Sequence, residues 1–118
     1  MEKIMAQHHS GDMLRGHTET IILRILMEGD SYGYEIAKKI TDGGKGYVDV
    51  KDATIYTAFR RMEEDGLLAT YWGDGVGGAR RRYYKITEKG RRVYDEKLKE
   101  WEVVNRILNL LIRGEENA

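Results

Sequence analysis

Apolar residues recur at helical spacing in three segments of the first half of the chain. Residues 14–28 carry them three or four positions apart, and residues 31–41 repeat the pattern after Ser31, a favourable N-cap. The third segment starts near Asp52, another residue that caps helices, and ends before Gly66. The pattern therefore predicts three consecutive helices.

The third predicted helix separates its side chains by type. At about 100° per residue, its apolar positions Ile55, Phe59 and Met62 form a buried stripe. The opposite face carries short polar side chains in its first turns and basic side chains after them. That outward face consists of Thr54, Thr57, Arg60 and Arg61.

Two β-prone runs follow, residues 67–72 and 80–87, and the glycine-rich sequence between them predicts a hairpin with a flexible tip. Thr87 then caps a final helix that ends at Arg113, before Gly114. At about 1.5 Å per residue this helix is about 40 Å long. The fold class expected from these elements is mainly α with a small β-hairpin.

The final helix carries more apolar surface than the first 87 residues could cover. The simplest cover is a second copy of the chain, which predicts a homodimer. Asn105 lies on the same seam, where a polar residue can set the register of the two helices. The apolar stripe consists of Tyr94, Leu98, Trp101, Val104, Leu108, Leu111 and Ile112.

Composition fits one globular domain. The chain has 118 residues, of which 41% are hydrophobic and 34% charged, with no cysteine and no proline. The absence of cysteine excludes thiolate zinc sites and cysteine nucleophiles. The longest apolar run, residues 21–27, contains Arg24 and is too short to cross a bilayer, so we expect a cytoplasmic protein without a membrane partner.

The net charge is zero, but the charges are unevenly distributed. Residues 51–92 hold ten basic and six acidic side chains. Within them, residues 80–92 hold seven basic side chains and one acidic side chain, Glu88. A local basic patch therefore exists despite the neutral total.

The order of elements points to a winged helix-turn-helix, in which the second helix of the unit enters a major groove of DNA. For residues 52–65 alone, an ordinary solvated helix face remains an equal alternative. Arg80, Arg81 and Arg82 favour DNA, because they repel one another on a free surface, whereas a phosphate backbone or a narrow minor groove stabilises them.

Other chemistry has weaker support. Gly73, Gly75 and Gly78 match a dinucleotide-binding pattern, but a strand follows them where that pattern requires a helix. The two serines, Ser10 and Ser31, lack the context of a nucleophile. We therefore expect neither an enzyme nor a cofactor.

The histidines are a poor metal cluster. His8 and His9 lie in a polar tail, and His17 and Asp12 bring no evident second shell. A flexible N-terminal arm over residues 1–12 is the simpler interpretation.

Trp101 has two interpretations. On base rates an indole on a dimer-forming helix is a core or interface residue. Alternatively, two Trp101 rings that meet across a two-fold axis could hold a flat aromatic molecule between them. Glu102 and Glu19 would then favour a cationic ligand.

Three stretches of the sequence resemble a known family. The strings "DATIYTAFRRMEEDGLL", "YWGD" and "GGARRRYYKITEKG" resemble the PadR family of winged-helix transcriptional regulators. The resemblance extends from Met13 to about Leu111, and it is strongest to a short, multidrug-sensing subgroup. It implies a homodimer that represses a transporter or stress gene at a pseudo-palindromic operator, and a flat pore where planar, often cationic, compounds stack between paired tryptophans.

The resemblance also assigns roles to residues. It divides the chain into an arm (1–12), a DNA-binding winged helix-turn-helix domain (13–87), a dimerisation helix (88–113) and a tail (114–118). The DNA-binding positions would be Tyr34, Lys38, Lys39, Thr54, Tyr56, Thr57, Arg60, Arg61, Arg80, Arg81 and Arg82. The ligand-binding positions would be Met13, Gly16, Glu19, Thr20, Leu98, Trp101, Glu102 and Asn105. Two alternatives remain: a winged helix that binds only proteins, and a small-molecule carrier without an operator.

Overall fold

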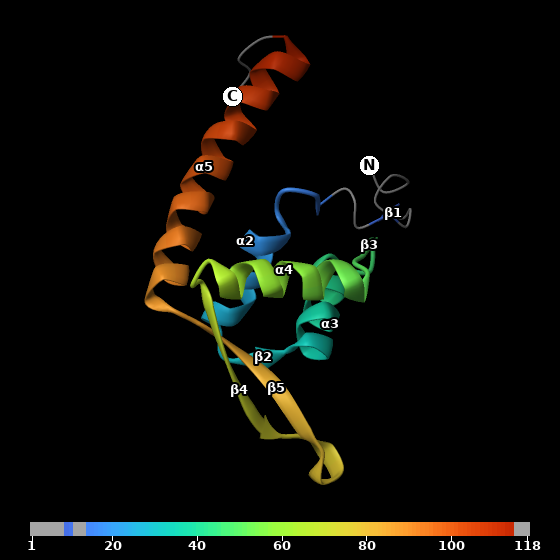
Figure 1. The fold of residues 1–118 in the computed structure, drawn as a ribbon. Coiled ribbons are helices and arrows are strands. Elements are labelled where there is room, and N and C mark those ends of the chain that lie inside the picture. The colour runs from blue at the N-terminus through green and yellow to red at the C-terminus, as the bar shows by residue number, and fades with distance from the viewer. Residues whose placement is uncertain (1–8, 11–13, 115–118) are drawn as a thin grey trace.

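The computed structural model describes residues 9–10 and 14–114, and four α-helices lie in these ranges (Figure 1), besides a short 3₁₀ helix, Val76–Gly78, at the tip of the hairpin. Three of them form a packed body, and the fourth leaves it. Their bounds are Thr18–Met27 for α2, Gly33–Gly43 for α3, Asp52–Glu64 for α4 and Glu88–Arg113 for α5. The predicted fold class, mainly α with a small hairpin, is confirmed.

Two small sheets accompany the helices. β1 (His9–Ser10) and β3 (Val48–Asp49) pair in parallel, and the other residues of the predicted N-terminal arm lie outside the described ranges. The second sheet is antiparallel and has the order β2-β5-β4. Its strands are β2 (Ser31–Tyr32), β4 (Leu68–Asp74) and β5 (Arg80–Ile86). We call the β4–β5 hairpin, residues 68–86, the wing.

The core lies between the three body helices and the base of the wing. Phe59 of α4 is buried and stacks on Tyr84 of β5, with 4.0 Å between the ring centroids. Ile55 and Met62 are buried on the same side of α4, as the wheel predicts. The sequence pattern of α4 therefore identifies its core face, and it leaves the opposite face exposed.

Two helix starts differ from the predictions. The first helix begins at Thr18 and not at residue 14, because Gly16 has φ of 87°, a left-handed conformation that a helix does not continue through. Ser31 does not cap α3. It is buried in β2, paired with Tyr84, and its hydroxyl donates to Glu35 at 2.5 Å.

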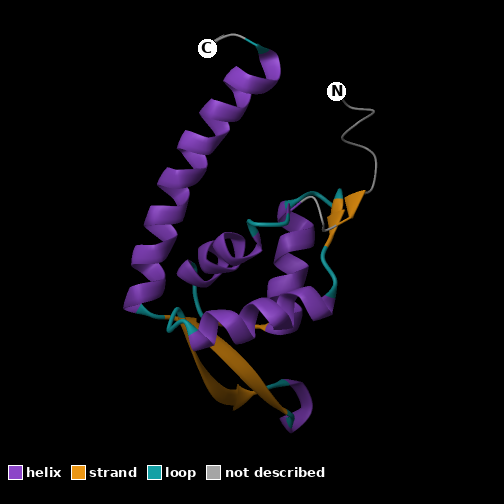
Figure 2. Ribbon diagram, turned by 45° about the horizontal axis from the view of Figure 1, so that its top comes forward, coloured by secondary structure: helices purple, strands orange, loops and turns teal. Residues whose placement is uncertain are grey.

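The last helix starts as predicted. The Thr87 hydroxyl accepts a hydrogen bond from the Gly90 amide at 3.0 Å, and Gly114 ends the helix with φ of 85°. Figure 1 shows α5 and the wing leaving the body in opposite directions, and Figure 2 shows the same separation. Most of the apolar side chains on the second half of α5 are therefore exposed, with Leu111 at 75%.

Gly90 allows α5 to start close to the body. A Cβ on this residue would overlap the Leu67 carbonyl oxygen and lie 2.7 Å from Cγ1 of Ile86. We expect Gly90→Ala to lower the free energy of unfolding by roughly 1–3 kcal/mol, because the backbone of Leu67 cannot move aside as a flexible side chain would. Urea denaturation followed by circular dichroism measures the change.

Gly43→Ala is the matched control. Gly43 is also helical, but a Cβ there would meet nothing within 4 Å. The gain in helix propensity is about 1 kcal/mol in both variants, so Gly43→Ala should be neutral or stabilising. Equal stability changes in the two variants would contradict the close contact at Gly90.

Candidate functional site

The exposed face of α4 carries the side chains that the sequence assigned to DNA. Thr54, Tyr56, Thr57 and Arg60 are all exposed. The Tyr56 ring lies against the backbone of Gly33, at a point where a Cβ would overlap the ring, so the start of α3 approaches α4 closely. Tyr34, one residue further along α3, is 73% exposed. The two helices thus present one polar surface.

The three arginines of the wing are not equivalent. Side chains alternate along β5, so Arg80 and Arg82 project from one face of the strand and Arg81 from the other. Each guanidinium lies over an aromatic ring: Arg80 is 5.8 Å from Trp72, Arg81 is 4.1 Å from Tyr32 and Arg82 is 5.9 Å from Tyr84. These contacts reduce the repulsion that the sequence suggested for three adjacent cations.

Arg82 connects the wing to α4. Its Nη2 lies 3.2 Å from Oε2 of Glu63 and donates to the Thr70 hydroxyl at 3.3 Å. The Glu63 side chain is only 29% exposed, so this ion pair is less screened than one at the surface. Arg82 is therefore fixed to α4 by an ion pair. For Arg80 and Arg81, the described contacts are with aromatic rings and include no acidic partner.

Three other basic residues were predicted to contact DNA. Two of them form ion pairs within the protein, and the third lines a cavity. Arg61 pairs with Glu19 of α2 at 3.4 Å, which turns its guanidinium toward the body. Lys38 pairs with Asp42 at 2.9 Å, and this hydrogen bond raises the pKa of Lys38. Both members of that pair are exposed, so the pair is weak and a phosphate can replace Asp42. Lys39 lines a cavity beside α5.

A cluster of tyrosines braces the other face of the wing. Tyr83 stacks on Tyr71 at 5.4 Å and meets Tyr32 edge-on at 5.6 Å. The Tyr71 hydroxyl donates to Asp30 at 2.6 Å, and this bond raises the pKa of Tyr71. The sequence did not predict this cluster, in which Tyr71 and Tyr83 are direct partners across β4 and β5. Together with Arg82 it fixes the wing to the body.

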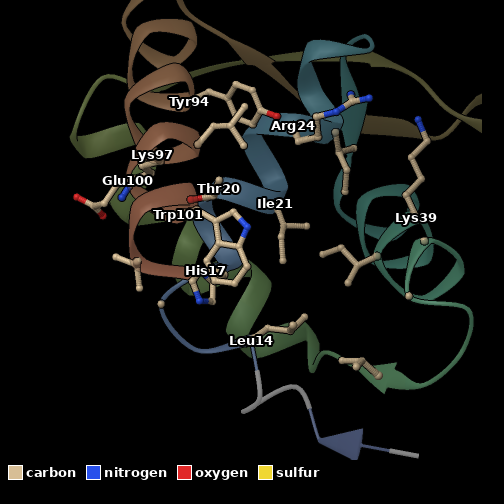
Figure 3. Close-up of a pocket in the computed structure, with 18 residues that line it drawn as sticks. Leu14, His17, Thr20, Ile21, Arg24, Lys39, Tyr94, Lys97, Glu100 and Trp101 are labelled. Atoms are coloured by element: carbon tan, nitrogen blue, oxygen red, sulfur yellow. The ribbon is translucent and has the colours of Figure 1, made fainter. Parts of the chain in front are cut away.

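A cavity of about 590 Å³ lies between α2, the end of α3 and α5 (Figure 3). Four of the predicted ligand-binding residues line it: Gly16, Thr20, Leu98 and Trp101. Trp101 is 42% exposed and meets the His17 ring edge-on, with centroids 5.0 Å apart. Trp101, the centre of the predicted aromatic site, thus lies at the wall of a cavity.

The other predicted ligand residues lie elsewhere. Glu19 is paired with Arg61, and neither Glu102 nor Asn105 lines the cavity of the single chain. Met13 lies outside the described residues. The charged side chains that do line the cavity are Arg24, Lys39, Lys97 and Glu100. The carboxylates invoked for a cationic ligand are therefore absent from this wall, and basic groups outnumber the acidic one.

Other classes of site have no counterpart in the described ranges. No group of three histidine, aspartate or glutamate side chains there could hold a metal ion. Among the same residues, no helix combines the length and the apolar character needed to cross a membrane. The features that remain for function are the α4 surface, the wing, the cavity and the exposed stripe of α5.

Comparison with known proteins agrees with this description. The sequence model of the transcriptional regulator PadR-like family matches residues 22–96. An uncharacterized protein from Lysinibacillus sphaericus is 40% identical over 103 residues, which are 87% of this chain and 94% of that protein.

Solved structures of similar chains show the same fold. A transcriptional regulator from Clostridium thermocellum is 42% identical, with a TM-score of 0.77 over 86% of this chain and 95% of that one. A PadR-like transcriptional regulator from Bacillus cereus is 33% identical, with a TM-score of 0.73 over 88% of this chain and 99% of that one. The similarity thus includes most of the chain in each case.

Proposed function

Since this chain belongs to the PadR-like family of transcriptional regulators, we propose that it acts as a homodimeric repressor of a multidrug-transporter or stress gene in a bacterial-type cytoplasm. It binds a pseudo-palindromic operator whose half-sites are about one helical turn apart. Planar aromatic compounds bound at the dimer interface relieve repression. In this last respect it resembles the lactococcal multidrug-sensing repressor.

The observation that carries the DNA-binding part is the relation between α4 and the wing. Arg80 and Arg82 project from the wing face that packs on α4, since Tyr84 of the same face stacks on Phe59. Arg82 of this face also contacts Glu63 of α4, which places the wing beside that helix. We therefore infer that a double helix seated on Thr54, Thr57 and Arg60 meets the wing as well. Protein-interaction modules of this fold have no need of such a basic wing.

The dimer is supported by the exposed stripe of α5. Leu98, Trp101 and Val104 belong both to this stripe and to the wall of the cavity. A second α5 packed on the stripe would cover the cavity along that side and bring a second Trp101 near the first. A ligand between them would then contact both protomers.

A path for coupling exists within one chain. Trp101 contacts His17 at the start of α2, and Glu19 in the first turn of α2 pairs with Arg61 of α4. A ligand that moves Trp101 therefore also acts on α2, and α2 is linked through Glu19 to α4, the proposed DNA-reading helix. The ligand changes DNA affinity if it binds one arrangement of these helices better than another.

Ligand binding is tested by fluorescence. Because the chain has two tryptophans, the experiment uses a Trp72→Phe background in which Trp101 is the only emitter. A planar ligand that stacks on the indole should quench its emission saturably. Cationic ethidium and anionic anthraquinone-2-sulfonate are titrated in parallel, because the cavity wall and the sequence favour opposite charges. No saturable quenching by either dye would contradict the proposal.

The regulatory role is tested by selecting bound fragments from the source genome with and without these dyes. A repressor should enrich one or a few palindromic fragments, and the effective dye should reduce their recovery. A small-molecule carrier predicts dye binding that operator DNA does not change, whereas coupling in a repressor is reciprocal. A protein-interaction module predicts no enriched fragment.

A further inference from the structure

Trp72 is an exposed indole in the middle of the wing. It is 60% exposed, although tryptophan is normally among the more buried residues. Its neighbour on the same strand face is Thr70, and Arg82 lies directly across from it on β5. Neither the core nor the cavity uses Trp72, so its exposure calls for a partner outside the single chain.

The strand face that carries Trp72 also packs on α4. Leu68 and Tyr84 on this face are buried, and Tyr84 stacks on Phe59 of α4. Because side chains alternate along a strand, Trp72 continues the same face beyond the core. Arg82, directly across from Trp72, contacts Glu63 of α4, so Trp72 lies on the part of the wing next to the helix that binds DNA in the proposed function.

Arg80 gives Trp72 a cationic neighbour. Its guanidinium lies 5.8 Å from the centroid of the indole and is exposed. The wing as a whole holds four basic side chains and one acidic side chain, Asp74, which lies opposite Arg80. An apolar ring beneath a cation, in a basic hairpin, matches the sugar and phosphate of a DNA backbone better than an apolar protein surface.

We propose that Trp72 is a DNA contact: its indole packs on deoxyribose at the edge of the groove beside α4, next to the phosphate that Arg80 approaches independently. This assignment rests on the proposed operator binding. It adds an apolar contact to a wing whose other DNA contacts are charges. Such a contact contributes affinity that does not depend on counterion release.

The two tryptophans of the chain make the contact directly measurable. In a Trp101→Phe variant of the full chain, Trp72 is the only emitter. Selected operator DNA should change the intensity and wavelength of its emission and protect it from acrylamide. In a Trp72→Phe variant, Trp101 should show no such protection, because it lies in the cavity at α5.

Affinity and its salt dependence separate the roles of the two side chains. Trp72→Ala should weaken operator binding about tenfold per half-site without changing the slope of log affinity against log salt concentration. Arg80→Ala should reduce that slope by about 0.9 for each phosphate that a guanidinium no longer neutralises. Trp72→Phe keeps an aromatic ring and should recover most of the affinity, and circular dichroism should show that Trp72→Ala keeps the folded body.

The Trp72 and Arg80 variants distinguish a direct DNA contact of the indole from an indirect role. A Trp72→Ala variant that binds more weakly and also has a smaller salt slope, as Arg80→Ala does, would show that the indole only positions Arg80 and would overturn the direct contact. If the wild-type chain binds its operator but Trp72→Ala binds equally well, the proposal fails and the repressor function stands. If the wild-type chain binds no genomic fragment, both fail. Unprotected Trp72 emission in the DNA complex would overturn the contact and favour a protein partner for the indole instead.

Discussion

Replacing Arg80 and Arg81 together with alanine is expected to weaken operator binding by on the order of a thousandfold at 0.1 M salt. A dimer would lose four guanidiniums, and if each neutralises one phosphate, the slope of log affinity against log salt falls by about 3.6. Both side chains have aromatic partners, so their removal leaves no buried carboxylate behind. Fluorescence anisotropy over a salt series measures affinity and slope together.

The variant leaves Arg82 in place because that residue holds Glu63 of α4. Removing it would disturb the position of the wing and mix two effects. The control is Arg91→Ala with Arg92→Ala, which deletes the same charge from exposed positions at the start of α5. An unchanged salt slope in the Arg80 and Arg81 variant, or an equal loss of affinity in the control, would contradict a phosphate contact by the wing.

Aspartate at Leu108 and Ile112 is expected to convert the proposed dimer to monomers at micromolar concentration. Both side chains are exposed in the single chain, at 43% and 78%. Burial of a leucine or isoleucine contributes roughly 1.5–3 kcal/mol, so four such side chains per dimer contribute roughly 6–12 kcal/mol. Sedimentation velocity should show the monomer mass, and operator affinity should fall because two half-sites are no longer linked.

Lys99→Asp provides the matched control. Position 99 lies about 180° around the helix from position 108, so a new carboxylate there faces away from the stripe. Circular dichroism should show that both variants keep the folded body, since the buried hydrophobic core extends from Ile22 to Ile86 and so precedes α5. A Leu108 and Ile112 variant that still sediments as a dimer would place the interface elsewhere.

The sequence predicts the elements of this fold well because each has a clear period or cap. The stripe of Ile55, Phe59 and Met62 identified the core face of α4, and Thr87 and Gly114 marked the ends of α5. Ser31 was misassigned because a good capping residue is also acceptable in a short strand. Its pairing with β5 is a contact between distant segments, which local pattern does not encode.

The candidate site could be predicted only in part, for a similar reason. Exposure of Thr54 and Thr57 follows from helical periodicity, and Trp101 follows from the stripe of α5. The partners of the charged residues do not follow, because Arg61 meets Glu19 and Arg82 meets Glu63 across elements. Glu19 is thus paired with Arg61 and does not line the cavity. Arg61 and Arg82 have acidic partners within the fold, whereas Arg80 and Arg81 are available for DNA.

Thr87 joins the wing to α5 and anchors this junction to the segment that follows α4. It is the single residue between β5 and α5, and its hydroxyl donates to the Gly66 carbonyl at 2.7 Å while its amide donates to the Leu67 carbonyl at 3.1 Å. Trp101 lies about 21 Å along α5 from this joint, and the seven residues of β5 extend about 23 Å in the other direction. The two arms are nearly equal, but Arg82 and Tyr71 hold the wing to the body. A ligand that displaces Trp101 would therefore load the junction at Thr87 before it moves the tip of the wing.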